Sequence, residues 1–441
     1  MNFSKNQVIV VGIIALVAIV FILGLMGIIP GIKKTTNSDP NFPTGSVTLQ
    51  MWGVGDEYSV YNDIIKLYQG VYKNVKINYT KFDDPVAYQQ KLIDALAANQ
   101  GPDIFMVNNL WVYNNWNKLY PAPSLLVTPQ VFSQSFPSVV SKDFVLSGNI
   151  FASPLSMDAL ALIYNKDIFN SKGIVFPPAT WDDFIADVAK ITEMDQNKKI
   201  SLSAAALGSA YNINNVPDIL SVLAMQSGSP INNPSGDGVI LDDPFNKAVQ
   251  FYTQFSNPIS PYYTWNESFD NSVSSFAAGQ TAMILDYYQS IKNIKNRNAY
   301  INLGVAPLPQ LTNANASQIA NWPSYWGLAV SKQTQNPYVA WSFIRYLTMT
   351  PSISSSYLTA TGKLPVLLSL IQQNLGGDNG VFLKEFLTTK DWFQIDPQSI
   401  DSIFTGMVND ILSGKLNVQA SVQAAQAALN NLYQPSSNLG Q

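Results

Sequence analysis

The apolar residues divide the chain into one long apolar run and a patterned remainder. The run, Val8–Ile29, holds 22 residues without a charge. A helix of that length spans the roughly 30 Å apolar core of a bilayer. We therefore interpret residues 1–34 as a transmembrane signal-anchor and the polar, proline-containing residues 35–46 as a flexible linker. A signal peptide that is removed is the alternative interpretation.

After the linker, strand-like and helix-like patterns alternate. Apolar stretches at 47–52, 75–79 and 104–107 predict strands, and helical periodicity at 57–73 and 88–99 predicts two intervening helices. This β-α-β-α-β order favours a mainly parallel sheet covered by helices. Ligands of such sheets bind beyond the C-terminal ends of the strands. Those ends carry Asp56 and Glu57 after the first strand, and Asn108, Asn109 and Trp111 after the third.

A second set of strands and helices follows, so an α/β fold is expected throughout the remainder. Strands are predicted at 159–164, 282–286, 304–308 and within 321–331. Helices are predicted at 181–192, 218–226, 243–255, 268–278, 336–349, 398–412 and 418–433. Thr180 with Asp183 has the capping-box spacing, and Asn336 before Pro337 and Asn417 are typical helix starts. Residues 436–441 form a tail.

Composition excludes several kinds of chemistry. The chain has no Cys and no His, so thiol nucleophiles, disulfides, Cys/His metal sites and imidazole catalysis are absent. Its net charge is −4, which argues against a nucleic-acid partner. Only Arg297 and Arg345 are arginine, so bidentate clamps for phosphate or dicarboxylate are scarce. We expect no cofactor and no metal.

Five segments, in order along residues 46–435, resemble those of the extracellular solute-binding proteins of ABC importers (family 1). That family includes the maltose- and oligosaccharide-binding proteins. The segments are QGPDI at 100–104, PLSMDALALIYNKD at the start of 154–184, FAAGQTAM at 276–283, PYVAWSFIRYL at 337–347 and GKLNV at 414–418. The anchor, the missing lipidation cysteine and the Asn/Ser-rich loop at 209–243 depart from the family pattern.

The resemblance implies a two-lobed periplasmic-binding-protein-like fold (type II), preceded by the one N-terminal transmembrane helix. Residues 47–155 and 328–362 would form lobe 1, and residues 156–327 and 363–435 lobe 2. Three segments would cross between the lobes, near Leu155–Asp158, Tyr325–Val330 and Gly362–Pro365. Gly362 and its flanking loops are plausible hinge points.

The resemblance and the residue types together suggest ligand contacts. Asp158 matches an acid that accepts hydroxyl hydrogen bonds from sugars in the maltose-binding branch, and a carboxylate suits polyols because it only accepts. Aromatic faces stack on sugar rings, and flanking Asn or Asp can hold hydroxyls. The other candidates are Asp286, Tyr287, Tyr288, Trp322, Tyr325, Trp326, Trp111, Asn108, Asn109 and Glu57. Capping, ion pairing or core packing is the alternative role for each of them.

The expected function is capture of a neutral solute, most simply a sugar or oligosaccharide, between the lobes of a monomer. The resemblance implies delivery to the permease of an ABC transporter. It also implies a plasma-membrane location, with the globular part on the extracytoplasmic face and the N-terminal helix as anchor. A polyamine or other cationic solute is an alternative ligand. A glycosidase with paired carboxylates, or an anchored sensor, is an alternative function.

Overall fold

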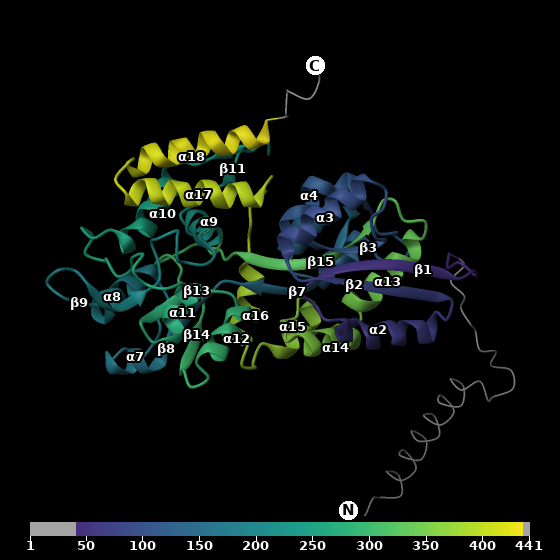
Figure 1. Cartoon of the computed structure of the whole chain (residues 1–441), viewed down its shortest axis with the longest axis horizontal. Helices are drawn as coiled ribbons and strands as arrows, with labels where there is room; N and C mark the ends of the chain where they lie inside the picture. Colours follow the sequence, from purple (N-terminus) through teal and green to yellow (C-terminus); the bar gives the residue numbers. More distant parts are fainter. Residues whose placement is uncertain (1–40, 435–441) are drawn as a thin grey trace, which may run out of the picture. The chain divides into compact units, whose positions relative to one another are not determined.

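A computed structural model describes residues 41–434. Within them, two large sheets carry the fold (Figure 1). The first sheet has six strands, in the order β2-β1-β3-β15-β4, with β7 also paired to β15. Its strands are β1 (Val47–Val54), β2 (Val75–Phe82), β3 (Ile104–Asn108), β4 (Leu119–Tyr120), β7 (Ala152–Ala159) and β15 (Pro323–Ser331).

The second sheet has five strands in the order β14-β8-β13-β10-β9. They are β8 (Ala161–Asn165), β9 (Glu193–Met194), β10 (Ile200–Ala205), β13 (Thr281–Asp286) and β14 (Leu303–Ala306). Two small hairpins complete the strands: β5 (Val145–Leu146) with β6 (Asn149–Ile150), and β11 (Ile231–Asn232) with β12 (Val239–Ile240).

The expectation of a mainly parallel sheet is wrong. In the first sheet β1 and β3 are parallel, but β15 is antiparallel to β3, β4 and β7. In the second sheet β10 and β13 are parallel, whereas β8 is antiparallel to both of its neighbours. Strand β15, the antiparallel neighbour of β3, enters from a distant part of the chain, which the local β-α-β pattern of residues 47–107 could not indicate.

Helices cover the first sheet on both faces. In Figure 1, α2, α13 and α14 lie together on one side of the strands, and α3 and α4 on the other. The bounds are α2 (Tyr58–Val71), α3 (Pro85–Ala97), η1 (Asn109–Trp111), α4 (Val112–Asn115), η2 (Trp116–Lys118), α5 (Pro129–Ser135), α6 (Ser138–Phe144), α13 (Pro337–Met349) and α14 (Pro351–Thr361). Asn336 occupies the N-cap position of α13 as predicted, but its side chain makes no capping hydrogen bond.

Around the second sheet, α9, α10, α17 and α18 pack together (Figure 1). The helices of this part are α7 (Lys166–Ser171), α8 (Trp181–Ile191), α9 (Val216–Gln226), α10 (Asp243–Thr253), η3 (Gln254–Ser256), α11 (Ser272–Ala277), α12 (Tyr288–Arg297), α17 (Pro397–Leu412) and α18 (Val418–Tyr433). The capping box of Thr180 and Asp183 is formed, and Asn417 caps α18.

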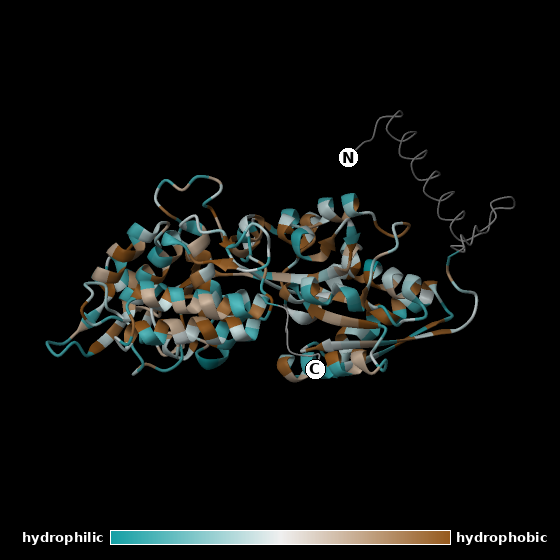
Figure 2. Cartoon of the chain, turned by 90° about the horizontal axis from the view of Figure 1, so that it is seen from above, coloured by the Kyte–Doolittle hydropathy of each residue, from teal (hydrophilic) through white to brown (hydrophobic). Residues whose placement is uncertain are grey.

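Between α14 and α17, the chain forms α15 (Leu368–Asn374), α16 (Gly380–Glu385) and η4 (Phe386–Thr388). Gly362 ends α14 with a left-handed φ of 67°, a conformation that favours glycine. Figure 2 shows hydrophobic and hydrophilic residues alternating around the helices, as expected where one helix face is buried against a sheet. Among residues 41–434, none of the helices has the length and apolar character needed to cross a bilayer. The predicted anchor at 1–34 lies outside the described residues.

Candidate ligand pocket

Two antiparallel strands, β7 and β15, connect the two sheets and position the candidate site. Strand β7 pairs with β15 in the first sheet, and after Leu160 the chain continues directly into β8 of the second sheet. A third segment lies alongside, because the backbone N–H of Met157 donates to the carbonyl of Leu364 at 3.3 Å. The three segments expected to cross between lobes are therefore neighbours in space.

Strand alternation decides which side chains of β7 and β15 share a face. Ser324 lies opposite Asp158, and Trp326 lies opposite Ser156. Since side chains two residues apart point to the same side, these four share one face, which we call the pocket face. Tyr325 has the opposite parity, and its side chain belongs to the reverse face. Beyond Trp326 the register shifts, so Gly327 pairs with Pro154 and Leu155 is an extra residue in β7.

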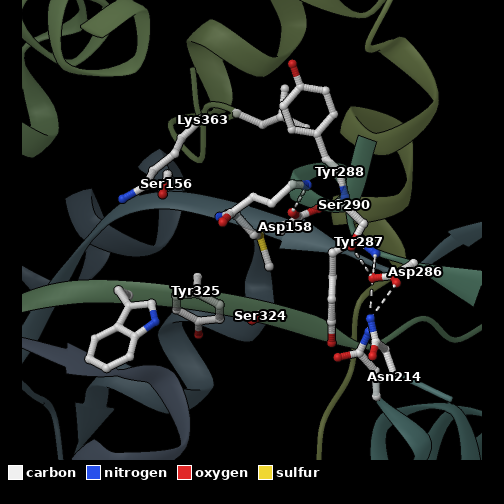
Figure 3. A pocket seen from close by; sticks show the side chains of 15 residues that line it. Ser156, Asp158, Asn214, Asp286, Tyr287, Tyr288, Ser290, Ser324, Tyr325 and Lys363 are labelled. Carbon is white, nitrogen blue, oxygen red and sulfur yellow. Dashed lines mark hydrogen bonds between the residues drawn. The ribbon is translucent and has the colours of Figure 1, made fainter. Parts of the chain in front are cut away.

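A cavity of about 250 Å³ adjoins the pocket face (Figure 3). Strands β7 and β15 contribute residues to it, and so do the end of β13, the start of α12, the loop before α9 and the segment after Gly362. The lining consists of Ser156, Met157, Asp158, Asn214, Asn215, Asp286, Tyr287, Tyr288, Gln289, Ser290, Ser324, Tyr325, Trp326, Lys363 and Leu364. Hydroxyl and amide groups dominate this lining, so the cavity suits a polar, uncharged molecule.

Asp158 caps a helix from a neighbouring strand. Its Oδ1 accepts from the backbone N–H of Tyr288 at 3.0 Å and of Ala159 at 2.9 Å, and its Oδ2 accepts from Gln289 at 3.2 Å. Tyr287, the N-cap residue of α12, makes no side-chain capping bond, so Asp158 takes that role. The carboxyl is only 6% exposed, and burial raises its pKa to about 7 although the backbone hydrogen bonds oppose the shift.

Asp286 holds the opposite wall of the pocket together. Its Oδ1 accepts from the hydroxyl of Ser290 at 2.6 Å, the backbone N–H of Tyr287 at 2.7 Å and the amide of Asn215 at 3.1 Å. Its Oδ2 accepts from the amide of Asn214 at 3.3 Å, and Figure 3 shows Asn214 reaching toward the carboxyl. The group is 2% exposed, and its burial raises the pKa.

The two tyrosines that follow Asp286 have different environments. The hydroxyl of Tyr287 donates to Asp218 at 2.7 Å, and burial raises the pKa of Asp218 to about 7. Tyr288 is half-buried, and its ring meets Phe382 edge-on at 5.4 Å. Trp326 is likewise half-buried, with the ring of Tyr88 6.3 Å away. Tyr288 and Trp326 therefore each keep part of a ring surface available to a ligand.

Lys363 brings a positive charge to the pocket wall, but an acid compensates it. Its Nζ lies 2.5 Å from Oδ1 of Asp56 and 3.1 Å from the hydroxyl of Tyr357. Asp56 also accepts from the hydroxyls of Tyr61 and Tyr357, at 2.9 and 2.7 Å. Among the described residues that line the pocket, Lys363 is the single cation. The pocket therefore offers no uncompensated positive charge to an anion.

Five of the predicted contacts lie in the pocket with their side chains on the pocket face or around it: Asp158, Asp286, Tyr287, Tyr288 and Trp326. Trp322 does not line it, because its ring is 1% exposed and packs in the core of the second sheet. Trp111 is the buried last residue of η1, and the side chain of Asn108 caps η1 by accepting from the backbone N–H of Leu110. Glu57 lies on the surface and pairs with Lys81 at 2.7 Å.

Asn109 and Tyr325 belong to a group behind the pocket that we call the reverse-face cluster. Its members are Asn109, Lys142, Asp143, Tyr325 and Asp391. The hydroxyl of Tyr325 donates to Asp143, and the amide of Asn109 donates to both Asp143 and Asp391. Tyr325 lines the pocket, yet its hydroxyl is engaged on the other side of the strand.

Sequence reasoning missed Asn214, Asn215, Ser290 and Lys363 as pocket residues. Asn214 and Asn215 lie in the Asn/Ser-rich loop, whose composition was the one available signal. Asn215 adopts a left-handed φ of 59°, which asparagine tolerates better than most residues. Among residues 41–434, no group of three or more acidic side chains is placed to hold a metal ion.

Comparison with known proteins identifies the family. The model of the bacterial extracellular solute-binding proteins matches residues 52–351. A maltotriose-binding protein of Pyrococcus abyssi is 24% identical over 322 residues, which cover 72% of this chain and 65% of that protein. The match thus spans slightly less than two thirds of that relative's length.

Two solved structures show the fold. The sugar-binding protein MalE of Xanthomonas citri has a TM-score of 0.74 at 20% identity, over 88% of this chain and 97% of that one. An ABC transporter solute-binding protein of Thermotoga lettingae, bound with α-D-tagatose, has a TM-score of 0.67 at 21% identity, over 88% and 100% of the two chains. Both likenesses indicate the mixed α/β, two-lobed periplasmic-binding-protein-like fold. With its family model matching more than half of the residues, the chain belongs to the bacterial extracellular solute-binding proteins.

Proposed function

We propose that the chain binds a neutral, hydroxyl-rich solute, a sugar or short oligosaccharide, in the pocket between β7, β15 and α12. The observation that carries this proposal is that the charged groups at the pocket are already engaged by groups of the protein. Lys363 is paired with Asp56, and the carboxyls of Asp158 and Asp286 already accept from neutral groups of the protein. The exposed parts of Tyr288 and Trp326 add ring surface that can stack on a sugar.

The same feature argues against a polyamine. Binding of a cation favours acids that are fully ionised near neutral pH, whereas burial raises the pKa of Asp158 to about 7 and raises that of Asp286 as well. Asp158 keeps acceptor capacity for a ligand hydroxyl, because two carboxylate oxygens offer about four lone-pair sites and three are used.

Domain organisation and cellular role extend the proposal. Residues 47–155 with 328–362 form lobe 1, and residues 156–327 with 363–435 form lobe 2, so that closure would bury the solute. Residues 1–34 anchor the protein to the plasma membrane, with the globular part on the extracytoplasmic face, and a monomer delivers its solute to an ABC permease. Family membership supports this role, and the maltotriose-binding relative supports the ligand class. An enzyme acting on the same solute, or an anchored sensor, is the competing function.

Thermal shift of the full-length chain tests the ligand class. Mono- to tetrasaccharides, polyols, spermidine, amino acids and sugar phosphates would be tested at millimolar concentration. A micromolar ligand should stabilise the folded state by about 4 kcal/mol. We expect sugars or polyols to raise Tm; a rise with spermidine alone would overturn the proposal. Sustained release of cleaved product from oligosaccharides would instead show an enzyme.

Replacing Tyr288 tests whether this pocket is the site. Tyr288→Ala removes the ring of a half-buried residue that lines the cavity, and we expect about tenfold weaker binding of the identified solute by titration calorimetry. Tyr300, which is 97% exposed and outside the pocket, offers the matched control: Tyr300→Ala should bind like the unmodified chain. Equal affinity of the two variants would place the ligand elsewhere.

A further inference from the structure

The reverse-face cluster joins two segments that lie far apart in the sequence. Lys142 donates from Nζ to Oδ1 of Asp391 at 2.6 Å. The amide of Asn109 lies 3.3 Å from Oδ2 of Asp143 and 3.4 Å from Oδ2 of Asp391, bridging the two carboxyls. The two carboxyl groups therefore face the same amide nitrogen. Two ionised carboxylates only accept and repel each other, whereas one proton bound between neighbouring carboxyls would let them hydrogen-bond.

Each acid is anchored in a different core. Asp143 precedes Phe144, which is fully buried and packs edge-on against Tyr325 at 5.3 Å. Asp391 precedes Trp392, which is 2% exposed, belongs to the core of the second sheet and donates to the hydroxyl of Ser221 in α9. The cluster therefore ties the part of the chain around the first sheet to the part around the second.

Other contacts extend this junction. The amide of Asn114 donates to the carbonyls of Gln394 and Ile395 at 3.0 and 2.8 Å. The ring of Tyr113 lies 4.2 Å from that of Phe393. These contacts are neutral, so their strength does not depend on protonation. The carboxyl pair is the part of the junction that a proton controls.

The charged groups around Asp143 are few. Burial raises its pKa well above the usual range, and the neighbouring Asp391 adds to this shift, while the Tyr325 hydroxyl and Lys142 oppose it. Lys390 is next to Asp391, but its Nζ donates to the carbonyl of Ser317 at 2.8 Å. The elements η1, α4, α5 and β5, which also pack on α6, carry no charged side chain. Strand β7 carries Asp158, which is directed to α12.

Water can reach the cluster. A cavity of about 560 Å³ is lined by Lys142 and Asp391 together with Ser138 and Ser229. The side chain of Lys142 is 52% exposed, whereas that of Asp391 is 2% exposed. A proton bound between the carboxyls can therefore exchange with solvent without unfolding of either part.

We propose that Asp143 and Asp391 form a proton-dependent clasp that holds the two sheets together on the reverse face and opposes closure over the pocket. Because the clasp and the pocket lie on opposite faces of β7 and β15, bringing the two parts together on the pocket face draws them apart on the reverse face. Loss of the proton leaves two carboxylates facing one Lys142, and their repulsion weakens the clasp. Rising pH then shifts the population toward the closed form and tightens solute binding.

The effect on solute affinity rests on the proposed function, whereas the clasp itself can be tested without a ligand. The chain has no cysteine, so Asp63→Cys in α2 and Gln423→Cys in α18 allow two spin labels on the full-length protein. Their distance distribution would be measured between pH 4 and pH 9. We expect a second, altered distance to gain population as pH rises.

Two variants decide the cause of that change. Asp143→Asn keeps a neutral side chain of the same shape and should hold the low-pH distribution at every pH. Tyr325→Phe removes a donor that favours the ionised carboxyl, so the midpoint should move up by about one pH unit. Asp167→Asn, at an exposed acid on α7, is the control and should behave like the unmodified chain.

The outcomes separate the two proposals. A distance distribution independent of pH, or an Asp143→Asn variant that keeps the full pH response, would overturn the clasp even if sugars bind. If the clasp responds as described and sugars fail to bind, the proposed function falls and the clasp remains. Where both hold, the affinity of the identified sugar should rise several-fold from pH 5 to pH 8, and Asp143→Asn should abolish that rise.

Discussion

On the pocket face of the crossing strands, Asp158 and Asp286 bind neutral donors of the protein itself, mostly backbone N–H groups and amides. On the reverse face, Asp143 and Asp391 share the amide of Asn109, and Asp391 pairs with Lys142. Several neutral donors hold a carboxyl group in one position. Two neighbouring carboxyl groups repel each other unless one of them is protonated. We therefore expect the pocket face to keep its shape and the reverse face to change with pH.

The largest expected effect comes from removing an acid on the pocket face. Asp286→Ala would leave the amides of Asn214 and Asn215 and the hydroxyl of Ser290 without their acceptor. Because these donors are partly buried, we expect a loss of about 3 kcal/mol in the free energy of unfolding, measured in urea. Asp286→Asn keeps one acceptor oxygen and should lose less. If Asp286→Ala were as stable as the unmodified chain, the hydrogen bonds of Asp286 would not be what holds the pocket face in shape.

The dependence of stability on pH is a smaller effect. Burial raises the pKa of Asp158, Asp218 and Glu385 to about 7 each, above the usual value near 4. An acid with a raised pKa binds more protons when folded, so its stabilisation is fully present below about pH 4 and is lost as pH rises through about 7. We expect Tm to fall by several degrees between pH 5 and pH 8.

Two variants measure how much Asp158, on the pocket face, contributes to the fall of Tm with pH. Asp158→Asn cannot titrate and should remove part of the fall in Tm, leaving the part due to Asp218 and Glu385, while Asp63→Asn at an exposed position should leave the fall unchanged. A Tm that rises or stays constant from pH 5 to pH 8 would contradict the burial of these carboxyls.

The smallest effect is expected at Glu57. Its carboxylate pairs with Lys81 at the surface and lines no described pocket. Exposed ion pairs add little to stability because water and salt screen them. Glu57→Gln should therefore leave both Tm and solute affinity unchanged within error. Weaker binding in this variant would mean that the pocket extends toward α2 in the bound state.

Much of the fold could be predicted because its signals are local. The apolar stretch at 159–164 predicted a strand directly after Asp158, and Thr180 with Asp183 marked the start of α8. The antiparallel entry of β15 could not be predicted, because it depends on pairing between residues about 170 positions apart, such as Ser324 and Asp158.

The site was predicted only in part for the same reason. Asp286 and Tyr288 follow a strand and were recognisable. Trp322 is an aromatic residue like the tyrosine and tryptophan that line the pocket. Its side chain, however, packs into the core of the second sheet. Lys363 and Asp56 are more than 300 positions apart, so no local sequence pattern could predict that they pair.

The extra residue Leu155 in β7 has a consequence for how this chain can change length. Side chains of a strand point to alternate faces, so each keeps its face only if residues are gained or lost in pairs. Deleting one residue between Leu155 and Asp158 would turn Asp158 away from α12. Gly327, opposite, is held to glycine because an added Cβ would lie 2.7 Å from the ring of Phe144 and 2.8 Å from the carbonyl of Ser153. Homologous chains should therefore differ in length in their loops rather than at this junction, where a single insertion or deletion would change the face of every following side chain of the strand.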